Sequence, residues 1–479
     1  MGVIGFKRKL SSINQDDTVR IDTKFGSLMD DSGYDIFKTN KRNLIPLKEV
    51  LIPNCRLFNF EEGKEYHGVP TGKEYTNEYG DITSSKIITK DDHPNRLRYK
   101  VDEESILISS LKGARTPALN FDFDLSNYVF SNGFYIFNVS KNWNRDFILL
   151  LLRTERLKFV LDNNLFRGIG ISSYKESDLL KIEIPYISLE TQRCALNKIN
   201  PIKKEQITLK DSLLGTKEII NEVFSSHFKI DIYDVDSMDK TRVLSIPLSS
   251  VKTNNSGLSG SLRWNKMQYI QNAIYSKIDC IEPLSRFIKS TKNGWSPSSV
   301  EGGEGVPVLG QEHFNSNTTL NIAPSKSTEE TRNNIEEFFI KKGDFFVSRG
   351  NTVDLVALAS IVTEEVESNI IYPDLYIKIE FDESNLDKEY LAFLFNSFIG
   401  RMYFKYVAKG KNQSMVKVSA VELLNFRVPI PCKQKQGEIL QAIKTKLSEQ
   451  KEIVRKIEQQ QHAINKIIED TIKIGHVNA

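Results

Sequence analysis

The sequence lacks long apolar runs, a cysteine pattern and a secretion signal. No stretch approaches the roughly eighteen apolar residues that a membrane-spanning helix requires. Basic residues near the N-terminus are not followed by an apolar region and a cleavage site. The four cysteines stand far apart and form no CxxC pair, which argues against a disulfide framework or a zinc site: Cys55, Cys194, Cys280 and Cys432. We therefore expect a cytoplasmic protein without a membrane partner.

The motifs of DNA-modifying and ATP-driven enzymes are also missing. The sequence has no Asn/Asp-Pro-Pro-Tyr/Phe motif for amino methylation, no glycine-rich S-adenosylmethionine loop and no GxxxxGK[ST] nucleotide loop. Residues 302–305 are glycine-rich, but they precede Val-Pro in an expected turn. The six histidines form no metal-ligand spacing. We expect no catalytic residue and no metal site, and a nuclease built from scattered carboxylates is the open alternative.

Length and composition indicate a globular protein of several domains. The chain has 479 residues, of which 39% are hydrophobic and 27% charged, and this length favours about two to four domains. The net charge of +3 permits binding to nucleic acid without arguing for it. If DNA is the partner, the positive charge must be concentrated on particular surfaces.

The chain repeats itself at an offset of about 240 residues. Short matches occur in the same order in both halves, which chance rarely produces. They pair residues 10–13 with 248–251, 46–47 with 283–284, 68–70 with 305–307, 72–74 with 310–312, 105–109 with 344–348, 134–136 with 375–377, and 178–192 with 422–436. Two related modules are therefore expected.

Each module mixes short β-rich runs with a helical segment, an α+β pattern. The β-rich runs include residues 105–109 and 345–348, and the helical segments are 146–161 and 388–406. The resulting domain plan is an N-terminal extension (1–43), a first module (44–192), a first spacer helix (193–228), a linker or extension (229–262), a second module (263–435) and a second spacer helix (436–475).

The segment that closes each half has apolar residues at heptad spacing, with Lys, Glu and Gln between them. The residues expected at the seam of a coiled coil are Ile199, Gln206, Leu209, Leu213, Ile220, Gln450, Ile453, Ile457, Ile464 and Ile467. A surface helix packed on its own domain is the alternative interpretation of each segment.

One antiparallel register would bring polar layers against polar layers. It places Ile199 against Ile467 and Gln206 against Gln460, as buried polar groups require. It also sets Thr216 against Gln450 and leaves one poor match, Ile220 against Lys446. We therefore predict an intramolecular antiparallel coiled coil between the modules. A helix of about 30 residues spans roughly 45 Å, comparable to one turn or more of B-DNA.

Short motifs in both halves resemble target-recognition domains of specificity subunits in type I restriction–modification systems. The end of each half carries them, in residues 184–187 with Gln192 and residues 428–431 with Gln436, each followed by a helix. The second half also has the Gly-Asp strand start in residues 340–345 and a Gly-Lys-Asn-Gln element in residues 410–413. The first half departs from this pattern, because residues 167–172 contain no counterpart of Gln413.

The resemblance implies a non-catalytic subunit in which each recognition domain binds one part of a split double-stranded DNA target. It also implies recruitment of adenine-N6 methyltransferase subunits, two by symmetry, and of nuclease–translocase subunits. S-adenosylmethionine, ATP and Mg²⁺ are then expected on those partners and not on this chain. The alternatives are the specificity subunit of a combined methylase–nuclease and a coiled-coil scaffold that does not bind DNA.

Loops at matching positions in the two halves supply the candidate DNA contacts. Arg suits guanine, Asn and Gln suit adenine, and Lys and Ser suit phosphates. The candidates are Lys73 and Tyr75 with Gln311 and His313; Ser110, Lys112 and Arg115 with Arg349 and Asn351; Arg167 and Ser172 with Lys409, Lys411, Asn412 and Gln413; and Trp295. For any one of them, an ordinary solvated loop residue is an equally good interpretation.

Overall fold

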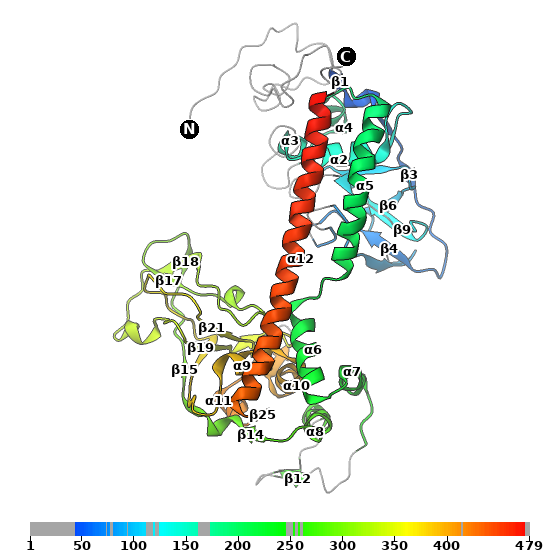
Figure 1. Ribbon diagram of the computed structural model, residues 1–479. Coiled ribbons are helices and arrows are strands. Elements are labelled where there is room, and N and C mark those ends of the chain that lie inside the picture. Colours follow the sequence, from blue (N-terminus) through cyan, green and yellow to red (C-terminus); the bar gives the residue numbers. More distant parts are fainter. Residues whose placement is uncertain are drawn as a thin grey trace. The chain divides into compact units, whose positions relative to one another are not determined.

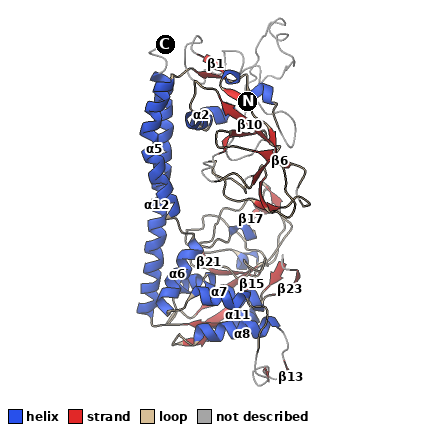
Figure 2. Ribbon diagram, turned by 90° about the vertical axis from the view of Figure 1, so that its right-hand side faces the viewer, coloured by secondary structure: helices blue, strands red, loops and turns tan. Residues whose placement is uncertain are grey.

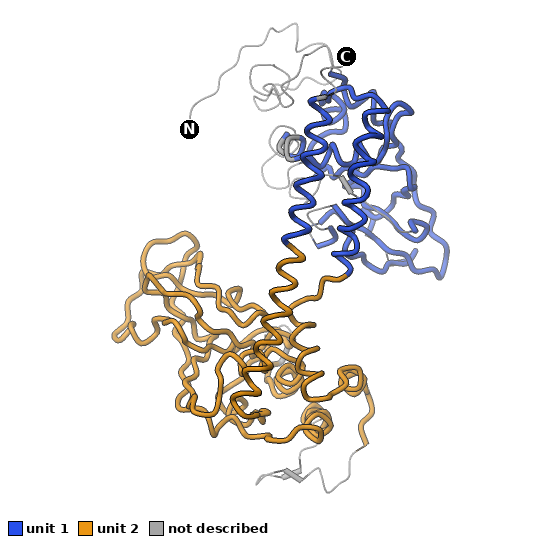
Figure 3. Tube along the Cα trace, viewed as in Figure 1, with its two compact units in different colours: residues 1–211, 455–479 blue, residues 212–454 orange. Residues whose placement is uncertain are grey.

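The computed structural model divides into two compact units, which Figure 3 colours separately. Unit 1 comprises residues 1–211 and 455–479, and unit 2 comprises residues 212–454. The structure describes residues 44–72, 74–76, 80–92, 94–111, 118–119, 124–160, 173–245, 252–253, 257–258, 262–412 and 415–474. No helix in these ranges is both long enough and apolar enough to cross a bilayer.

Unit 1 combines short strands with helices (Figure 1). Its strands are β1 (Leu44–Pro46), β2 (Leu51–Pro53), β3 (Arg56–Leu57), β4 (Tyr66–Val69), β5 (Lys86–Ile88), β6 (Leu97–Lys100), β7 (Ile106–Ser109), β8 (Ala118–Leu119), β9 (Tyr128–Ser131), β10 (Phe134–Val139) and β11 (Glu183–Pro185). Its helices are η3 (Leu47–Glu49), α2 (Arg145–Leu152), α3 (Glu155–Val160), α4 (Glu176–Leu179) and α5 (Leu189–Asp211).

Unit 2 has the same kinds of element and three helices near its start. Its helices are α6 (Thr216–Phe228), α7 (Ile232–Lys240), α8 (Leu262–Tyr275), η6 (Leu284–Arg286), η7 (Gln311–His313), η8 (Ile335–Phe338), α9 (Lys388–Asn396), α10 (Phe398–Val407) and α11 (Ala420–Leu424). Its strands are β12 (Lys252–Thr253), β13 (Gly257–Leu258), β14 (Ile281–Pro283), β15 (Ile288–Asn293), β16 (Val300–Glu301), β17 (Val306–Val308), β18 (Lys326–Thr328), β19 (Phe345–Ser348), β20 (Gly350–Asn351), β21 (Ala359–Ile361), β22 (Tyr376–Phe381), β23 (Lys409–Asn412), β24 (Met415–Lys417) and β25 (Arg427–Pro429). The last helix, α12 (Lys433–Ile474), contributes its first part to unit 2 and its remainder to unit 1.

The two units share two of their sheets, and they differ in others, which include a five-stranded sheet in unit 1 and two three-stranded sheets in unit 2. A four-stranded antiparallel sheet has the order β2-β10-β7-β8 in unit 1 and β15-β22-β19-β21 in unit 2. A two-stranded ladder pairs β1 with β11, and its counterpart pairs β14 with β25. The registers also correspond, since Leu44 lies opposite Pro185 and Ile281 lies opposite Pro429. The internal duplication expected from the sequence is therefore present in the fold, and the fold mixes helices and strands as predicted.

A completely buried glutamine in the first turn of each long helix bonds to the start of a helix within the module. Gln192 and Gln436 are both 0% exposed. The Oε1 atom of Gln192 accepts from the amide of Asn144 at 2.7 Å, and that of Gln436 accepts from the amide of Asp387 at 2.8 Å. Asn144 and Asp387 are the residues that cap α2 and α9. The Nε2 atoms donate to the carbonyls of Asn142 and Ile187 in unit 1, and of Asn385 and Pro431 in unit 2. The start of each long helix is thus tied to the start of a module helix.

The Gly-Asp element of the second half forms a tight turn into β19. Gly343 has a φ of +86°, in the region that favours glycine. One carboxylate oxygen of Asp344 accepts from the amide of Lys341 at 2.8 Å, and the other pairs with Lys378 at 2.7 Å. Both side chains of this ion pair are largely buried. In this unit the motif therefore has a structural role.

Within unit 1, α5 packs antiparallel on the last turns of α12, and the two helices lie side by side in Figures 1 and 2. Ile199 is fully buried in a core that also contains Ile464, and Ile467 packs against the same core. The side chain of Gln206 donates to the carbonyl of Ile457 at 3.2 Å, not to the side chain of Gln460. The antiparallel direction of the two helices follows the predicted register. The side chain of Gln206, however, contacts a residue one turn away from Gln460, its predicted partner.

Within unit 2, α6 packs antiparallel on the first part of α12. Gln450 accepts from the amide of Leu214 at 2.9 Å, and Lys446 pairs with Glu222 at 2.6 Å. Ile220 is fully buried in the core of this unit. The lysine that made a poor match in the predicted register therefore reaches an exposed carboxylate instead of facing the apolar layer.

The prediction of a continuous spacer helix over residues 193–228 is wrong. The helix is broken between Asp211, where α5 ends, and Thr216, where α6 begins. Leu213, expected at the seam, is 36% exposed in this break. Gly215 occupies an extended conformation before α6, and glycine in a helix interior costs about 1 kcal/mol relative to alanine. The heptad spacing of the sequence therefore continues through residues 212–215, where the backbone is not helical.

The two expected module helices are also divided. Residues 146–161 contain α2 and α3, and residues 388–406 contain most of α9 and α10. The hydroxyl of Ser397 accepts from the amide of Ile399 and caps α10. Serine favours such a cap because its side chain satisfies an amide at the helix start.

Candidate nucleic-acid interface

Several of the predicted DNA contacts lie outside the described residues. They are Lys73, Lys112, Arg115, Arg167, Ser172 and Gln413. Lys411 and Asn412 belong to β23, but their side chains are not described. The geometry available for a binding surface therefore comes mainly from unit 2.

Unit 2 brings its candidates together around a small three-stranded sheet with the order β20-β24-β23. Asn351 lies in β20 opposite Val416, and Lys409 lies in β23 opposite Lys417. The Nε2 atom of Gln311 donates to the carbonyl of Gly350. Candidates from three separate stretches of sequence thus meet at one place.

Lys409 presents its charge to solvent. Its side chain is 81% exposed, and its ammonium group lies 2.7 Å from the carboxylate of Glu422. Glu422 closes the capping box of α11 together with Ser419. The carboxylate therefore holds the base of the hairpin, and the exposed lysine suits a phosphate contact.

Arg349 follows β19 and is half-buried beside this sheet. Its Nη1 atom donates to Asp374, to the carbonyl oxygen at 3.3 Å and to the carboxylate at 3.4 Å. The side chains of Arg349 and Asp374 are 28% and 45% exposed. Sequence reasoning missed Asp374, because the only signal was a Pro-Asp turn before the matched strand β22.

Tyr75, Ser110 and His313 are buried, at 7%, 8% and 4% exposure. Tyr75 belongs to a hydrophobic cluster of unit 1, and the hydroxyl of Ser110 donates to the carbonyl of Gly133 at 2.8 Å. Their side chains therefore hold the fold together and do not line its surface. Trp295 is partly buried against a core of unit 2.

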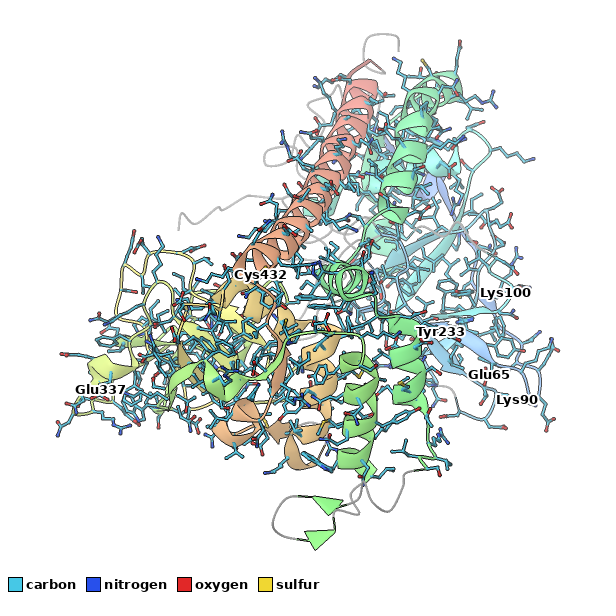
Figure 4. All side chains as sticks on the ribbon, turned by 60° about the horizontal axis from the view of Figure 1, so that its bottom comes forward. Glu65, Lys90, Lys100, Tyr233, Glu337 and Cys432 are labelled. Atoms are coloured by element: carbon cyan, nitrogen blue, oxygen red, sulfur yellow. The ribbon has the colours of Figure 1, made fainter. Side chains whose placement is uncertain are left out.

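Unit 1 presents basic residues that the sequence did not single out. Arg98 and Lys100 are exposed on β6, and Lys90 is exposed after β5. Figure 4 shows the side chains of Lys90 and Lys100 projecting outward from this part of the chain. The alternation of apolar or aromatic residues with basic residues along β6 was the signal available in the sequence.

His313 predicts a pH dependence of stability. Burial lowers the pKa of this imidazole, against the opposing effect of Glu312, and its Nδ1 atom has no hydrogen-bond partner within the described ranges. As the pH falls through about 6.5, the unfolded chain gains a proton that the folded ring resists, so the free energy of unfolding decreases.

We expect His313→Gln to reduce the loss of stability of unit 2 between pH 7.5 and 5.5, measured by urea unfolding at both pH values. The matched control is His462→Gln, which replaces an exposed histidine. Equal acid sensitivity of His313→Gln and the unmodified chain would contradict this assignment.

One pocket of about 400 Å³ lies beside the start of α9. Its lining includes Asp387, Lys388 and Glu389, and all three are engaged structurally. Asp387 caps α9, Lys388 pairs with Glu383 at 3.0 Å, and Glu389 pairs with Lys444 at 2.6 Å. In the described part of the chain, no group of three or more histidine, cysteine or acidic residues has the arrangement of a metal site.

Comparison with known proteins gives similarities at the level of solved structures. No protein-family model matches the chain. No curated protein matches it either. Three similar solved structures come from restriction–modification systems.

Three of these structures span nearly the whole chain. One comes from work on complex assembly and conformational transition of the type I R-M system; it is 13% identical, covers 90% of this chain and 97% of its own, and gives a TM-score of 0.45. The HsdS subunit from Thermoanaerobacter tengcongensis is 14% identical over 91% of this chain and 96% of its own, with a TM-score of 0.32. The type I restriction–modification S subunit from M. genitalium is 10% identical over 89% of this chain and 95% of its own, with a TM-score of 0.38.

Proposed function

We propose that this chain is the DNA-specificity subunit of a type I restriction–modification system and performs no chemistry itself. Each recognition domain binds one part of a split double-stranded target. The chain recruits adenine-N6 methyltransferase subunits, two of them, and nuclease–translocase subunits. S-adenosylmethionine, ATP and Mg²⁺ are bound by those partners.

The observation that carries this proposal is a duplicated frame with different side chains at matched positions. The four-stranded sheets, the two-stranded ladders and the glutamine links correspond between the units. At one matched position after the central strand, however, unit 1 has Ser110 and unit 2 has Arg349. A shared frame with different side chains at matched positions suits two recognition sites for two different DNA sequences.

The proposal includes the antiparallel coiled coil and the domain plan predicted from the sequence. Contacts of α5 and of α6 with α12 support it, because Gln206 meets Ile457 in unit 1 and Leu214 meets Gln450 in unit 2. The break at residues 212–215 divides the first spacer into two helices. We therefore assign both spacer segments to one helical connection between the recognition domains.

Selection from random DNA duplexes tests the proposal. The full chain, alone and with its modification subunits, should enrich a consensus of two parts at a fixed separation. Changing that separation by about five base pairs, half a helical turn, should reduce binding toward the non-specific level. Affinity should also fall as salt rises, because phosphate contacts release counterions.

A consensus of one part, or binding that tolerates any separation, would contradict reading of a split target. A chain that binds proteins through its module loops, and no DNA with the modification subunits present, would be a scaffold instead.

A further inference from the structure

The backbone of Arg349 is fixed on both sides. Its amide donates to the carbonyl of Leu375 at 2.7 Å, and its carbonyl accepts from the amide of Val418 at 2.8 Å. In unit 1 the amide of Ser110 donates to Gly133, and its carbonyl accepts from Tyr174. The two residues therefore occupy equivalent places in the duplicated frame, and only unit 2 carries an arginine there.

The carboxylate beside Arg349 is also held in place. Ser296 donates through its hydroxyl to Asp374 Oδ1 at 2.8 Å and accepts from the amide of Asp374 at 2.9 Å. The opposite oxygen, Oδ2, meets the guanidinium. Gly294 allows this packing, because a Cβ atom there would lie 2.2 Å from the carbonyl of Pro373. Asp374 is thus oriented before any ligand arrives.

This arrangement leaves donors of the guanidinium available. Contacts of Arg349 with Asp374 use Nη1, and Nε and Nη2 have no hydrogen-bond partner among the described residues. An ion pair this exposed contributes about 0–1 kcal/mol to stability. A contribution to stability therefore does not by itself explain why Ser296, Asp374 and Arg349 are linked by hydrogen bonds at this surface.

The chemistry of a base edge fits these donors better than that of a phosphate. Guanine offers two neutral acceptors, O6 and N7, that match two donors of a planar guanidinium. The partly exposed carboxylate of Asp374 repels the full charge of a phosphate more strongly than it repels the neutral acceptors of guanine. Fixing the side chain also lowers the entropy lost on binding.

We propose that Arg349 recognises a guanine in the part of the DNA target bound by unit 2, with Asp374 as its positioning residue. This inference rests on the proposed function. It adds the identity of one base and the residue that reads it.

The test compares base preferences of full-length variants with that of the unmodified chain, using random duplexes and then single-base substitutions of the selected site. We expect Arg349→Ala to lose discrimination for one guanine by about 5- to 150-fold. Arg349→Lys should also lose it, because an ammonium group lacks the planar fork. Asp374→Asn should weaken discrimination at the same base without affecting other positions.

Arg286→Ala is the matched control. Arg286 is an exposed arginine with an ion pair of 2.6 Å to Glu282, and it precedes β15. Arg286 lies close to Ile288, the first residue of β15, which pairs with Phe381. Arg349 lies near Ile377, which pairs with Asn293 at the opposite end of β15. The control should leave the base preference unchanged.

The outcomes separate the inference from the proposed function. If the unmodified chain selects a two-part consensus but Arg349→Lys retains full discrimination at every base, Arg349 is not a guanine reader. Lower affinity for all sequences together with a smaller salt slope would make it a phosphate contact. If the unmodified chain selects no consensus, the proposed function fails and the inference fails with it.

Discussion

Replacing Phe426 by alanine is expected to lower the free energy of unfolding of unit 2 by about 3–5 kcal/mol. Phe426 is fully buried. Its ring lies 4.7 Å from that of Tyr403, 5.0 Å from that of Phe404 and 5.3 Å from that of Phe395, measured between centroids. Removing it leaves a cavity where β25 meets α9 and α10, and three aromatic rings lose a contact at once.

Hydrogen exchange measured by mass spectrometry is the suitable readout, because it reports each region separately. Peptides from α9 and α10 should exchange faster in the Phe426→Ala variant. Phe426→Leu should give a smaller loss, since it leaves a smaller cavity. Tyr233→Ala is the matched control. Tyr233 is an aromatic residue of the same unit that is 79% exposed and is labelled in Figure 4, so its loss should change stability by less than about 0.5 kcal/mol.

A loss below about 1 kcal/mol in Phe426→Ala would show that the aromatic cluster does not hold β25 to the two helices.

The duplication and the strands could be predicted because they depend on local patterns. Residues 345–347 are all apolar, and β19 is buried on both faces. Proline at the end of β11 and of β25, with a glutamine seven residues later, is one of the ordered matches that aligned the two halves. These signals lie within a few residues of each other, so the sequence shows them directly.

The break between α5 and α6 could not be predicted from heptad spacing. Leu213 lies seven residues after Gln206 and seven before Ile220, as a heptad seam requires, yet it is exposed. The bond from the amide of Leu214 to Gln450 depends on a residue more than 200 positions away. Spacing reports which residues could face one side of a helix, and not whether the backbone remains helical.

The surroundings of Arg349 show the same limit at the candidate site. The arginine was identified from its place after a matched strand, but its partners Asp374 and Ser296 come from two other loops. Tyr75 shows the opposite error, since an aromatic residue in a polar loop suggested a surface contact and its ring is in the core. Side chains that converge from distant loops require the tertiary structure.

Replacing Gln436 by leucine is expected to destabilise unit 2 by about 2–4 kcal/mol, because it leaves buried backbone groups without partners. The substitution removes the acceptor for the amide of Asp387 and the donor to the carbonyls of Asn385 and Pro431. Leucine fills a similar volume, so the loss measures hydrogen bonding more than packing.

The effect should be greatest at the start of α9, where faster amide exchange is the expected signal. Gln434→Leu is the matched control on the same helix. Gln434 is exposed and bonded only to Glu438, four residues further along α12. Its replacement should change stability by less than about 0.5 kcal/mol. If both variants lost the same stability, the contribution of the buried link would be disproved.

Gln192→Leu provides an independent measurement of the same link in unit 1, with the amide of Asn144 in place of that of Asp387. Because both glutamines are fully buried and use the same atoms, the two losses should agree within about 1 kcal/mol. The link joins the first turn of a long helix to the first turn of a module helix. Equal losses would mean that the connections between α2 and α5 in unit 1 and between α9 and α12 in unit 2 are energetically equivalent.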